Sequence, residues 1–403
     1  MQNSKKQVLI QFIENTLAYA LPVFLLQFVV YPLIAKKLGS ELNGLFLTMI
    51  ALNYFVTNIT ATVLANTRLL LNQKYQESGE RGDFNILFLI FSLVNTIIIC
   101  VATFWYKGGT VTAQDLGFSV VVILLFLYHD YVTAQYRLQL QFRKIFFNNL
   151  ILCAGYLIGL VVFYHFLPVW QVVFMIPYIM TAIYDMCNTD FIREPLRITP
   201  LFSVTTKQYF ILAGSSLLST AVTYGDRLIL YPLMDGTSVS IFTSAQLVGK
   251  LLQMISTPLS SFMLSYLVKR KTMKLSISFK HILLVIGLGC VMYAGCLIVG
   301  NPMIRLLYSE WAEQSLYYVY FTAATGVLHM LVVLTNVILL RFTKSSWQIV
   351  KSVTYLCAYM FLSFPLLRVY GLMGFCVGNL LASAIELALI LAVLFKEKVI
   401  VLK

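Results

Sequence analysis

The sequence predicts an all-α polytopic membrane protein whose twelve transmembrane helices form two parallel-repeat six-helix lobes around a central cavity. Composition predicts the class, because 60% of the residues are hydrophobic and only 11% are charged, whereas soluble domains are roughly 25% charged. The long apolar segments predict the number of helices, because about 20 apolar residues are needed to cross the hydrocarbon core of a bilayer. An internal sequence repeat predicts the two lobes.

Twelve apolar segments are long enough to cross a membrane, and they fall into two sets of six. The first set lies at about 8–35, 43–71, 84–106, 116–137, 145–166 and 168–188. The second set lies at about 207–232, 238–268, 279–299, 314–340, 346–366 and 371–395. The connections between these segments are too short to hold a soluble domain, so we expect the function to reside in the helices.

Basic residues predict the orientation of the helices, since cytoplasmic loops carry an excess of Lys and Arg. With both termini in the cytoplasm, most of the 29 Lys and Arg fall at the cytoplasmic ends of the spans. This bias, with attraction to anionic lipid head groups, explains the net charge of +13, which needs no nucleic-acid partner. Lys5 and Lys6 precede an apolar run that is too long for a signal peptide, so we expect the first helix to remain as an anchor.

Two short strings recur at the same spacing and suggest that one six-helix unit is used twice. Tyr31–Leu33 (YPL) recurs as Tyr231–Leu233, and Leu140–Lys144 (LQFRK) is echoed by Leu340–Lys344 (LRFTK). Because six is an even number, both halves enter the membrane from the same side, and the repeat is parallel. Internally repeated helical membrane proteins are usually transporters with the substrate site between the repeats. The predicted domains are an N-terminal lobe at 1–188, a cytoplasmic linker at 189–206 and a C-terminal lobe at 207–403.

The polar residues of the eighth and second spans follow one face of each helix. Gln246, Lys250 and Gln253 are separated by steps of four and three residues, which places them on one side of a helix. Asn53 and Thr57 begin a similar stripe in the second span. Lipid offers no hydrogen-bond partners, so these stripes must face other helices or water. Bonding between helices explains isolated Ser and Thr, whereas the Gln-Lys-Gln stripe favours a water-filled cavity.

Charged residues inside the spans are functional candidates, because a central charge costs roughly 2.5–3.5 kcal/mol on insertion. Lys250 lies near the middle of its helix with no carboxylate three or four residues away, and Arg227 lies towards the end of the seventh span. Cations at this depth would attract a phosphate or pyrophosphate, which Arg binds in a bidentate manner. Asp226 offers Arg227 a structural partner instead, and both interpretations stay open.

Each carboxylate in the spans also has a structural and a functional interpretation. Asp130 follows His129 well inside the fourth span, where a buried ion pair is the structural alternative. Glu386 lies in an otherwise apolar helix and fits either a structural partner or a proton carrier. Glu14 either pairs with a basic loop residue or titrates at the mouth of the cavity. The candidates for lining the cavity or coupling transport to an ion are therefore Glu14, Asn53, Thr57, Asp130, Asp226 and Glu386.

Neither a metal site nor a catalytic centre is expected. The seven cysteines show no CxxC spacing, and none of the four histidines is spaced with Cys or carboxylates as metal ligands are. No Walker motif is present, which argues against ATP hydrolysis by this chain. We therefore predict no cofactor, no catalytic residue and no enzymatic activity.

Two turns resemble those of a known family. Residues 223–230 (TYGDRLIL) close an apolar helix, and after a short turn 241–245 (IFTSA) supply an aromatic residue followed by small ones. The counterpart in the first half is 38–46 (LGSELNGLF). This pattern resembles the Wzx-type polysaccharide-repeat-unit flippases of the multidrug/oligosaccharidyl-lipid/polysaccharide exporter superfamily. Asp235 and Ser240 depart from the pattern, which has glycines at these positions.

The resemblance implies a central cavity lined by the first two helices of each lobe, which are the polar helices noted above. It also implies a substrate, an oligosaccharide repeat unit on undecaprenyl pyrophosphate. That substrate would be flipped across a bacterial inner (plasma) membrane by alternating access, for O-antigen or capsule synthesis. Lys250 and Arg227, with Gln246 and Gln253, would hold the pyrophosphate. The expected partners are this lipid-linked oligosaccharide, membrane lipids and other polysaccharide-assembly proteins.

Two other functions stay open. A drug/cation antiporter of the same superfamily would use anionic cavity residues, and the predicted spans contain five acids against two bases. A membrane polymerase or ligase of the polysaccharide pathway is the second alternative. Such enzymes need an exposed catalytic domain or a large loop, and the short connections of this chain argue against them.

Overall fold

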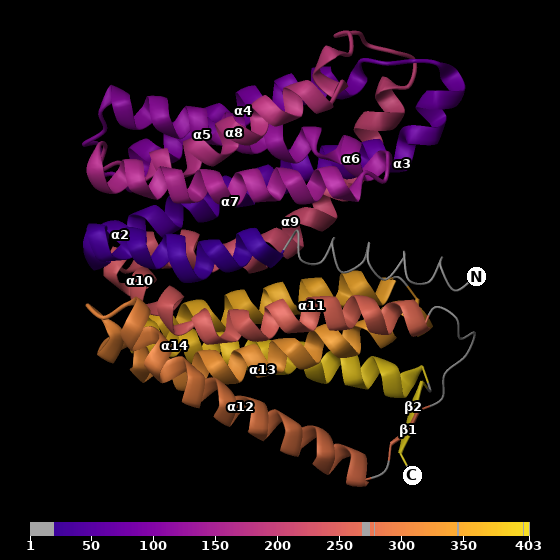
Figure 1. Cartoon of the computed structure of the whole chain (residues 1–403). Coiled ribbons are helices and arrows are strands. Elements are labelled where there is room, and N and C mark those ends of the chain that lie inside the picture. The colour runs from indigo at the N-terminus through magenta and orange to yellow at the C-terminus, as the bar shows by residue number, and fades with distance from the viewer. Residues whose placement is uncertain (1–19, 268–274, 278, 345, 398, 403) are drawn as a thin grey trace. The chain divides into compact units, whose positions relative to one another are not determined.

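Helices make up nearly all of the chain that the computed structural model describes, which is residues 20–267, 275–277, 279–344, 346–397 and 399–402. Internal contacts divide the chain into two compact units, Met1–Asp235 and Gly236–Lys403 (Figure 1). The first unit contains η1 (Leu26–Val30), α2 (Tyr31–Thr57), η2 (Asn58–Thr62), α3 (Val63–Ser78), α4 (Asp83–Tyr106), α5 (Ala113–Val132), α6 (Ala134–Leu138), α7 (Phe142–His165), α8 (Gln171–Asn188), η3 (Phe191–Arg193) and α9 (Phe202–Leu233). The second contains α10 (Gly236–Ala245), α11 (Leu247–Leu267), β1 (Leu275–Ile277), α12 (Phe279–Leu307), α13 (Ala312–Phe342), α14 (Ser346–Lys396) and β2 (Ile400–Leu402).

The chain reverses direction at Gly39, inside α2. The backbone of Gly39 has φ 74° and ψ 172°, a conformation that is essentially restricted to glycine. The rings of Tyr31 and Phe46, on either side of it, lie 5.6 Å apart edge to face. An unbroken helix would separate these two residues by more than about 20 Å. The segments before and after Gly39 therefore form a helical hairpin.

A second reversal lies at Gly371, inside α14. Its backbone has φ 59° and ψ −147°, again a conformation that favours glycine. The reversal brings Lys351 of the first arm within 3.6 Å of Glu386 of the second arm. The two residues are far apart in sequence, so the contact depends on the hairpin.

The helix that follows Gly39 is interrupted by the π-helical turn η2, and α9 packs against this turn. A π turn disturbs the regular pattern of main-chain hydrogen bonds and leaves carbonyl groups available to other donors. The carbonyl of Ile59 accepts a hydrogen bond from the Tyr209 hydroxyl at 3.2 Å. The carbonyl of Asn58 accepts one from Ser216 Oγ at 3.4 Å. These bonds, with contacts to α2 and α3, make α9 part of the first unit.

The segment that leads into α9 is fixed to the first unit by side chains of α3 and α4. Arg68 of α3 forms an ion pair with Glu194, and its guanidinium lies 3.3 Å from the ring centre of Phe191. Asn85 of α4 donates a hydrogen bond to the carbonyl of Phe191 at 2.8 Å. The segment 189–206 is thus held against the helices of the first unit. The predicted division into lobes at 1–188 and 207–403, with 189–206 as the linker between them, stays a prediction.

In the second unit, α13 packs against α11, α12 and α14. The shared core includes Val248 of α11 and Val319 and Ala323 of α13, all of them buried. The short strands β1 and β2 pair in parallel, with Leu275 opposite Ile400 (Figure 1).

Seven helices in the described part of the chain are long and apolar enough to cross a membrane. Two of them, Ala20–Ser78 and Ser346–Lys396, contain the reversals at Gly39 and Gly371. Large apolar side chains such as Leu93, Val291 and Ile298 are exposed on the surface at 65%, 69% and 74%. Such a surface is expected where lipid is the solvent.

Replacing Gly39 by Ala should lower the free energy of unfolding by about 1–3 kcal/mol, because a side chain strains this backbone conformation. The matched control is Gly117→Ala, in the exposed interior of α5, where an added Cβ meets no atom within 4 Å. That control should be neutral or slightly stabilising, since Ala favours helix. Thermal unfolding in detergent measures both variants, and equal behaviour would contradict the assigned reversal.

Candidate functional site

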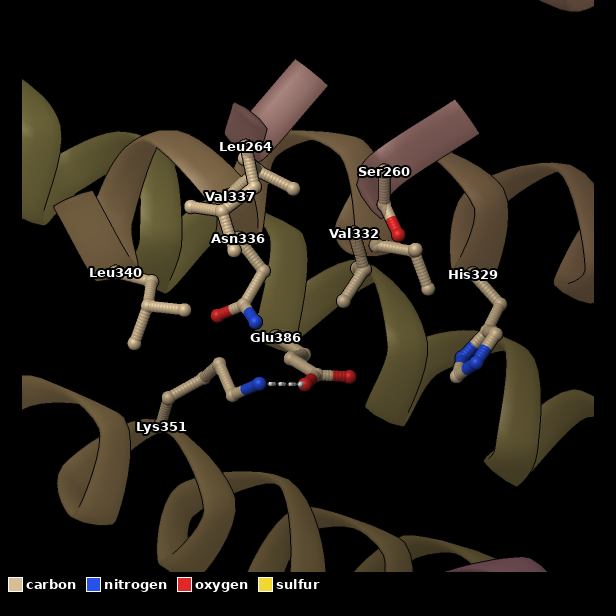
Figure 2. A pocket seen from close by; sticks show the side chains of 10 residues that line it. Ser260, Leu264, His329, Val332, Asn336, Val337, Leu340, Lys351 and Glu386 are labelled. Atoms are coloured by element: carbon tan, nitrogen blue, oxygen red, sulfur yellow. Dashed lines mark ion pairs between the residues drawn. The ribbon is translucent and has the colours of Figure 1, made fainter. Parts of the chain in front are cut away.

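A pocket with a volume of about 250 Å³ lies inside the second unit. It lies between α11, α13 and α14, and half of the residues that line it are apolar. Four polar or charged residues of α13 and α14 converge on it (Figure 2). The lining residues are Ser260, Leu264, His329, Val332, Val333, Asn336, Val337, Leu340, Lys351 and Glu386.

The ion pair between Lys351 and Glu386 is the central feature of this pocket. The Nζ atom of Lys351 lies 3.6 Å from Oε1 of Glu386, and the two side chains are only 15% and 7% exposed. A carboxylate in apolar surroundings needs a counter-ion or a proton. The hairpin at Gly371 provides the counter-ion from the other arm of the same helix. Glu386 is one of the candidates predicted from the sequence. Lys351 was expected only as one of the basic residues at the cytoplasmic ends of the helices.

His329 and Asn336 of α13 complete the polar side of the pocket. Figure 2 shows Glu386 between Lys351 on one side and His329 on the other, with Asn336 nearby. The Oδ1 atom of Asn336 is buried and has no hydrogen-bond partner among the described residues. The pocket therefore offers an ammonium donor, an amide acceptor and an imidazole. This set can hold a small polar ligand.

The predicted candidates Asn53 and Thr57 face the interior of the first unit. Their side chains are 1% and 2% exposed. The amide of Asn53 donates a hydrogen bond to the carbonyl of Met49 at 2.8 Å, within its own helix. Asp130 of α5 accepts a hydrogen bond from Thr62 of η2 at 2.8 Å. Asp130 thus joins α5 to η2, while Asn53 and Thr57 are buried within the first unit. Glu14 lies outside the described residues.

Asp226 and Arg227 are buried near the end of α9, with 6% and 7% of their surface exposed. The carboxylate of Asp226 accepts a hydrogen bond from the backbone N–H of Arg227 at 2.8 Å. The Nε of Arg227 has no hydrogen-bond partner among the described residues. The Arg227 guanidinium interacts electrostatically with the hydroxyls of Tyr31 and Tyr224. An arginine with spare donors is suited to an anionic ligand.

Gln246, Lys250 and Gln253 lie together at the start of the second unit. Gln246 precedes α11, and its backbone carbonyl accepts the N–H of Lys250 at 3.1 Å, as in a helix. Gln246 and Lys250 are half-buried and Gln253 is exposed. Next to this stripe α11 packs against α13, where Gly249 lies so close to Gly326 that a Cβ on Gly326 would meet Gly249 Cα at 2.7 Å. The water-filled cavity that the stripe was predicted to face stays a prediction.

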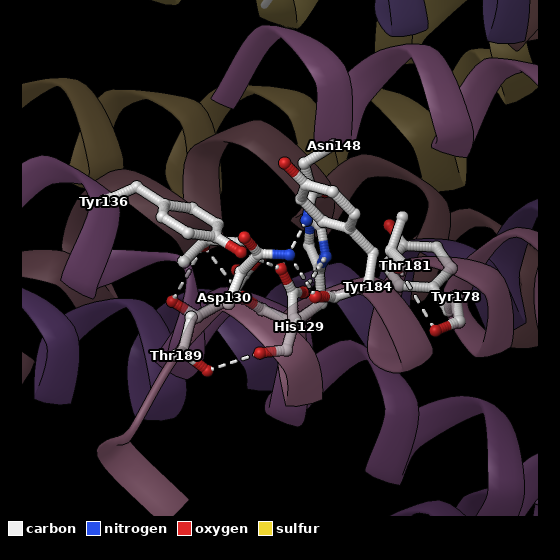
Figure 3. Close-up of polar contacts among 11 residues, drawn as sticks. His129, Asp130, Tyr136, Asn148, Tyr178, Thr181, Tyr184 and Thr189 are labelled. Atoms are coloured by element: carbon white, nitrogen blue, oxygen red, sulfur yellow. Dashed lines mark hydrogen bonds and ion pairs between the residues drawn. The ribbon is translucent and has the colours of Figure 1, made fainter. Parts of the chain in front are cut away.

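A second polar cluster surrounds Asp185 in the first unit, and sequence analysis did not select it as a site. Asp185 is completely buried and accepts hydrogen bonds from the Tyr136 hydroxyl at 2.7 Å and from Asn148 Nδ2 at 2.5 Å. Nδ1 of His129 lies 3.8 Å from its other oxygen. Figure 3 shows Tyr136, Asn148 and His129 gathered around this point. The cluster joins α5, α6, α7 and α8, so it stabilises the packing of the first unit.

Comparison with known proteins gives a fold but no sequence relative. No family model matches the chain, and no curated protein sequence matches it. Among solved structures, the chain is similar to the lipid II flippase MurJ in an inward closed conformation. The TM-score is 0.72 and the identity 15%, over 96% of this chain and 88% of that chain.

Transporters of the MATE family have a similar fold. An inward-facing multidrug resistance MATE transporter of the MOP superfamily gives a TM-score of 0.62 at 13% identity, over 95% of both chains. A eukaryotic MATE transporter gives 0.61 at 13% identity, over 98% of this chain and 97% of that chain. At these identities the comparisons establish a shared fold.

The pocket yields a test of its ion pair. Replacing Lys351 by Met should lower the free energy of unfolding by about 3–5 kcal/mol, because Glu386 is left buried without a counter-ion. The double variant Lys351→Met with Glu386→Leu should regain most of this loss, since both charges are removed. Thermal unfolding in detergent measures the cycle.

The control for this cycle is Arg305→Ala. It removes an ion pair with Glu313 whose side chains are 59% and 76% exposed, so it should cost less than about 1 kcal/mol. A double variant no more stable than Lys351→Met would show that the two side chains act separately.

Proposed function

We propose that this protein flips a lipid-linked oligosaccharide across a bacterial inner membrane by alternating access. The observation that supports this most directly is the fold, which extends over 96% of the chain and is similar to that of a lipid II flippase. The proposed substrate is an oligosaccharide repeat unit on undecaprenyl pyrophosphate, destined for O-antigen or capsule. Both termini are proposed to be cytoplasmic, as the distribution of Lys and Arg predicts.

The proposed transport unit has twelve spans in two six-helix lobes. Two features of the fold support this count. The reversals at Gly39 and Gly371 each divide one continuous helical segment into two arms. The arms of α14 and the segments on either side of Gly39 correspond to four of the predicted spans.

Lys250 and Arg227 are the proposed ligands of the pyrophosphate, with Gln246 and Gln253 as additional hydrogen-bond donors. Arg227 has a buried Nε without a hydrogen-bond partner among the described residues. The hydrogen bond of 2.8 Å to Asp226 is donated by the backbone N–H of Arg227 rather than by its guanidinium. Lys250 adds a second positive charge from another helix. Pyrophosphate carries several negative oxygens, so two cations with amide donors match its chemistry.

Coupling to an ion is a second part of the proposal. The carboxylates proposed to take up a proton during the transport cycle are Glu386 and Asp130. Glu386 is paired with Lys351, and Asp130 is paired with Thr62. Protonation of Glu386 would release Lys351, which gives the second unit two electrostatic states. If transport into vesicles is unchanged by imposed pH and sodium gradients, this coupling is excluded.

A drug/cation antiporter is the second candidate function. The observation that favours it is the similarity in fold to MATE transporters, together with the carboxylates Asp130, Asp226 and Glu386. A cationic drug would be attracted by these acids and repelled by Lys250 and Arg227. The two functions therefore predict opposite effects for removal of a cation.

Replacing Lys250 by Ala should reduce flipping of a pyrophosphate-linked oligosaccharide by roughly tenfold or more, since a hydrogen bond to a charged group contributes about 1.5–3 kcal/mol. Lys250→Arg should retain most of the activity. The assay is the appearance of a fluorescent lipid-linked oligosaccharide in the opposite leaflet of proteoliposomes.

The control for the flipping assay is Arg368→Ala, which removes an exposed cation and should leave the rate unchanged. Normal flipping by Lys250→Ala in stably folded protein would reject the assigned pyrophosphate site. Efflux of a cationic dye that increases in the same variant would support the antiporter instead.

A further inference from the structure

The turn between α6 and α7 holds a leucine where a glycine is usual. Leu140 has φ 53°, a left-handed conformation that glycine normally provides at the end of a helix and that is rare for a bulky residue. The turn is closed by a hydrogen bond from the Gln141 N–H to the Tyr136 carbonyl at 2.8 Å. The Leu140 side chain is 70% exposed, so packing inside the unit does not explain the leucine.

One face of α7 continues from this turn as an exposed apolar stripe. Its members are Phe147, Leu150, Leu157, Ile158 and Val161, between 37% and 55% exposed. Arg143 precedes the stripe by one helical turn, and Tyr164 follows it. At about 1.5 Å per residue, Arg143 and Tyr164 are roughly 30 Å apart, the thickness of a hydrocarbon core. If the stripe faces lipid, Arg143 lies at the depth of the head groups.

Two cations of the turn have no carboxylate partner within the part of the chain that the structure describes. Arg143 is exposed, and its guanidinium lies 5.7 Å from the ring centre of Phe147. The ammonium of Lys144 lies 6.0 Å from the ring centre of Tyr136. The rings orient both cations without neutralising them.

The acids near the turn have other partners. Asp190 donates its backbone N–H to Gln135 of α6 at 2.8 Å, so it lies close to the turn. Its carboxylate pairs with Arg193 at 3.4 Å. Glu194, four residues further on, pairs with Arg68. The charge that remains at the turn is therefore positive, and its complement is an anion.

We propose that the turn Gln139–Lys144 binds the head group of an anionic phospholipid. Arg143 and Lys144 contact the lipid phosphate, and the exposed side chain of Leu140 inserts among the first methylene groups of the acyl chains. The lipid contact explains why a leucine occupies a backbone conformation that suits glycine. The turn lies on the side of the membrane predicted to be cytoplasmic, where anionic lipids attract basic residues.

The experiment compares purified protein in nanodiscs of phosphatidylcholine with protein in nanodiscs that also contain phosphatidylglycerol. For the unmodified protein, phosphatidylglycerol should raise the thermal unfolding midpoint. The double variant Arg143→Ala, Lys144→Ala should unfold normally in phosphatidylcholine but lose most of that increase. Leu140→Gly should raise the midpoint in both nanodiscs by relieving the backbone, and should keep the response to phosphatidylglycerol because Arg143 and Lys144 are unchanged.

The matched control is Lys74→Ala, Arg81→Ala, which removes two exposed cations on the same predicted side of the membrane. It should keep most of the response to phosphatidylglycerol. If both double variants lose the response to phosphatidylglycerol equally, the response depends on the overall positive charge of the protein, and the proposed site is wrong. Loss of the response in Leu140→Gly would overturn the assignment of the phosphate contact to the two cations.

A photo-crosslinking side chain at position 140 shows whether this residue contacts lipid or another protein in cells. Phospholipid adducts are expected. An adduct with another protein in place of lipid would assign the surface to a protein partner and reject the proposal.

Discussion

A bilayer offers no hydrogen bonds to the main chain, so every irregularity in a membrane helix must find its partners inside the protein. The first unit shows how this constraint builds tertiary structure. The π turn η2 presents the carbonyls of Asn58 and Ile59 to hydroxyl donors of α9. At the end of α7, Lys37 donates to the carbonyl of Phe163 at 2.7 Å. These helices are joined at places where their own hydrogen bonding is interrupted or ends.

The same constraint governs the charges. Glu386 is buried beside Lys351, and Asp185 is buried beneath donors from α6 and α7. Glu386 and one oxygen of Asp185 are thus compensated by residues of their own unit. Arg227 differs, because its side-chain Nε is buried without a hydrogen-bond partner in the described chain.

Sequence alone predicts the long apolar helices, because hydropathy is a local property that sums along a segment. It also predicts which residues share a helix face, as with Gln246 and Lys250. It does not predict the neighbour that a face meets, so Asn53 and Thr57 were selected without any indication that they point into the first unit. The pair of Lys351 and Glu386 joins the two arms on either side of Gly371. The predicted spans 346–366 and 371–395 place a turn between these arms, but hydropathy does not give the side-chain partners across it. Leu140 gives no sequence signal at all, since leucine is an ordinary residue next to a helix end.

The repeated strings also show that a sequence pattern does not determine local backbone geometry. Leu140–Lys144 crosses from the end of α6 into α7, whereas the first three residues of Leu340–Lys344 are the last turn of α13. The matching residues of the two strings therefore have different backbone conformations. A short sequence match indicates ancestry of a segment more readily than it indicates its geometry.

The position of the boundary between the two units bears on how the protein is made. All elements of the first unit, including α9, are encoded before Gly236. The ion pair between Arg68 and Glu194 and the hydrogen bonds around Asp185 join residues that all precede Gly236. These contacts can therefore form before the second unit is synthesised. Insertion can proceed in two successive steps, and α9 is the last helix required before the first bundle closes.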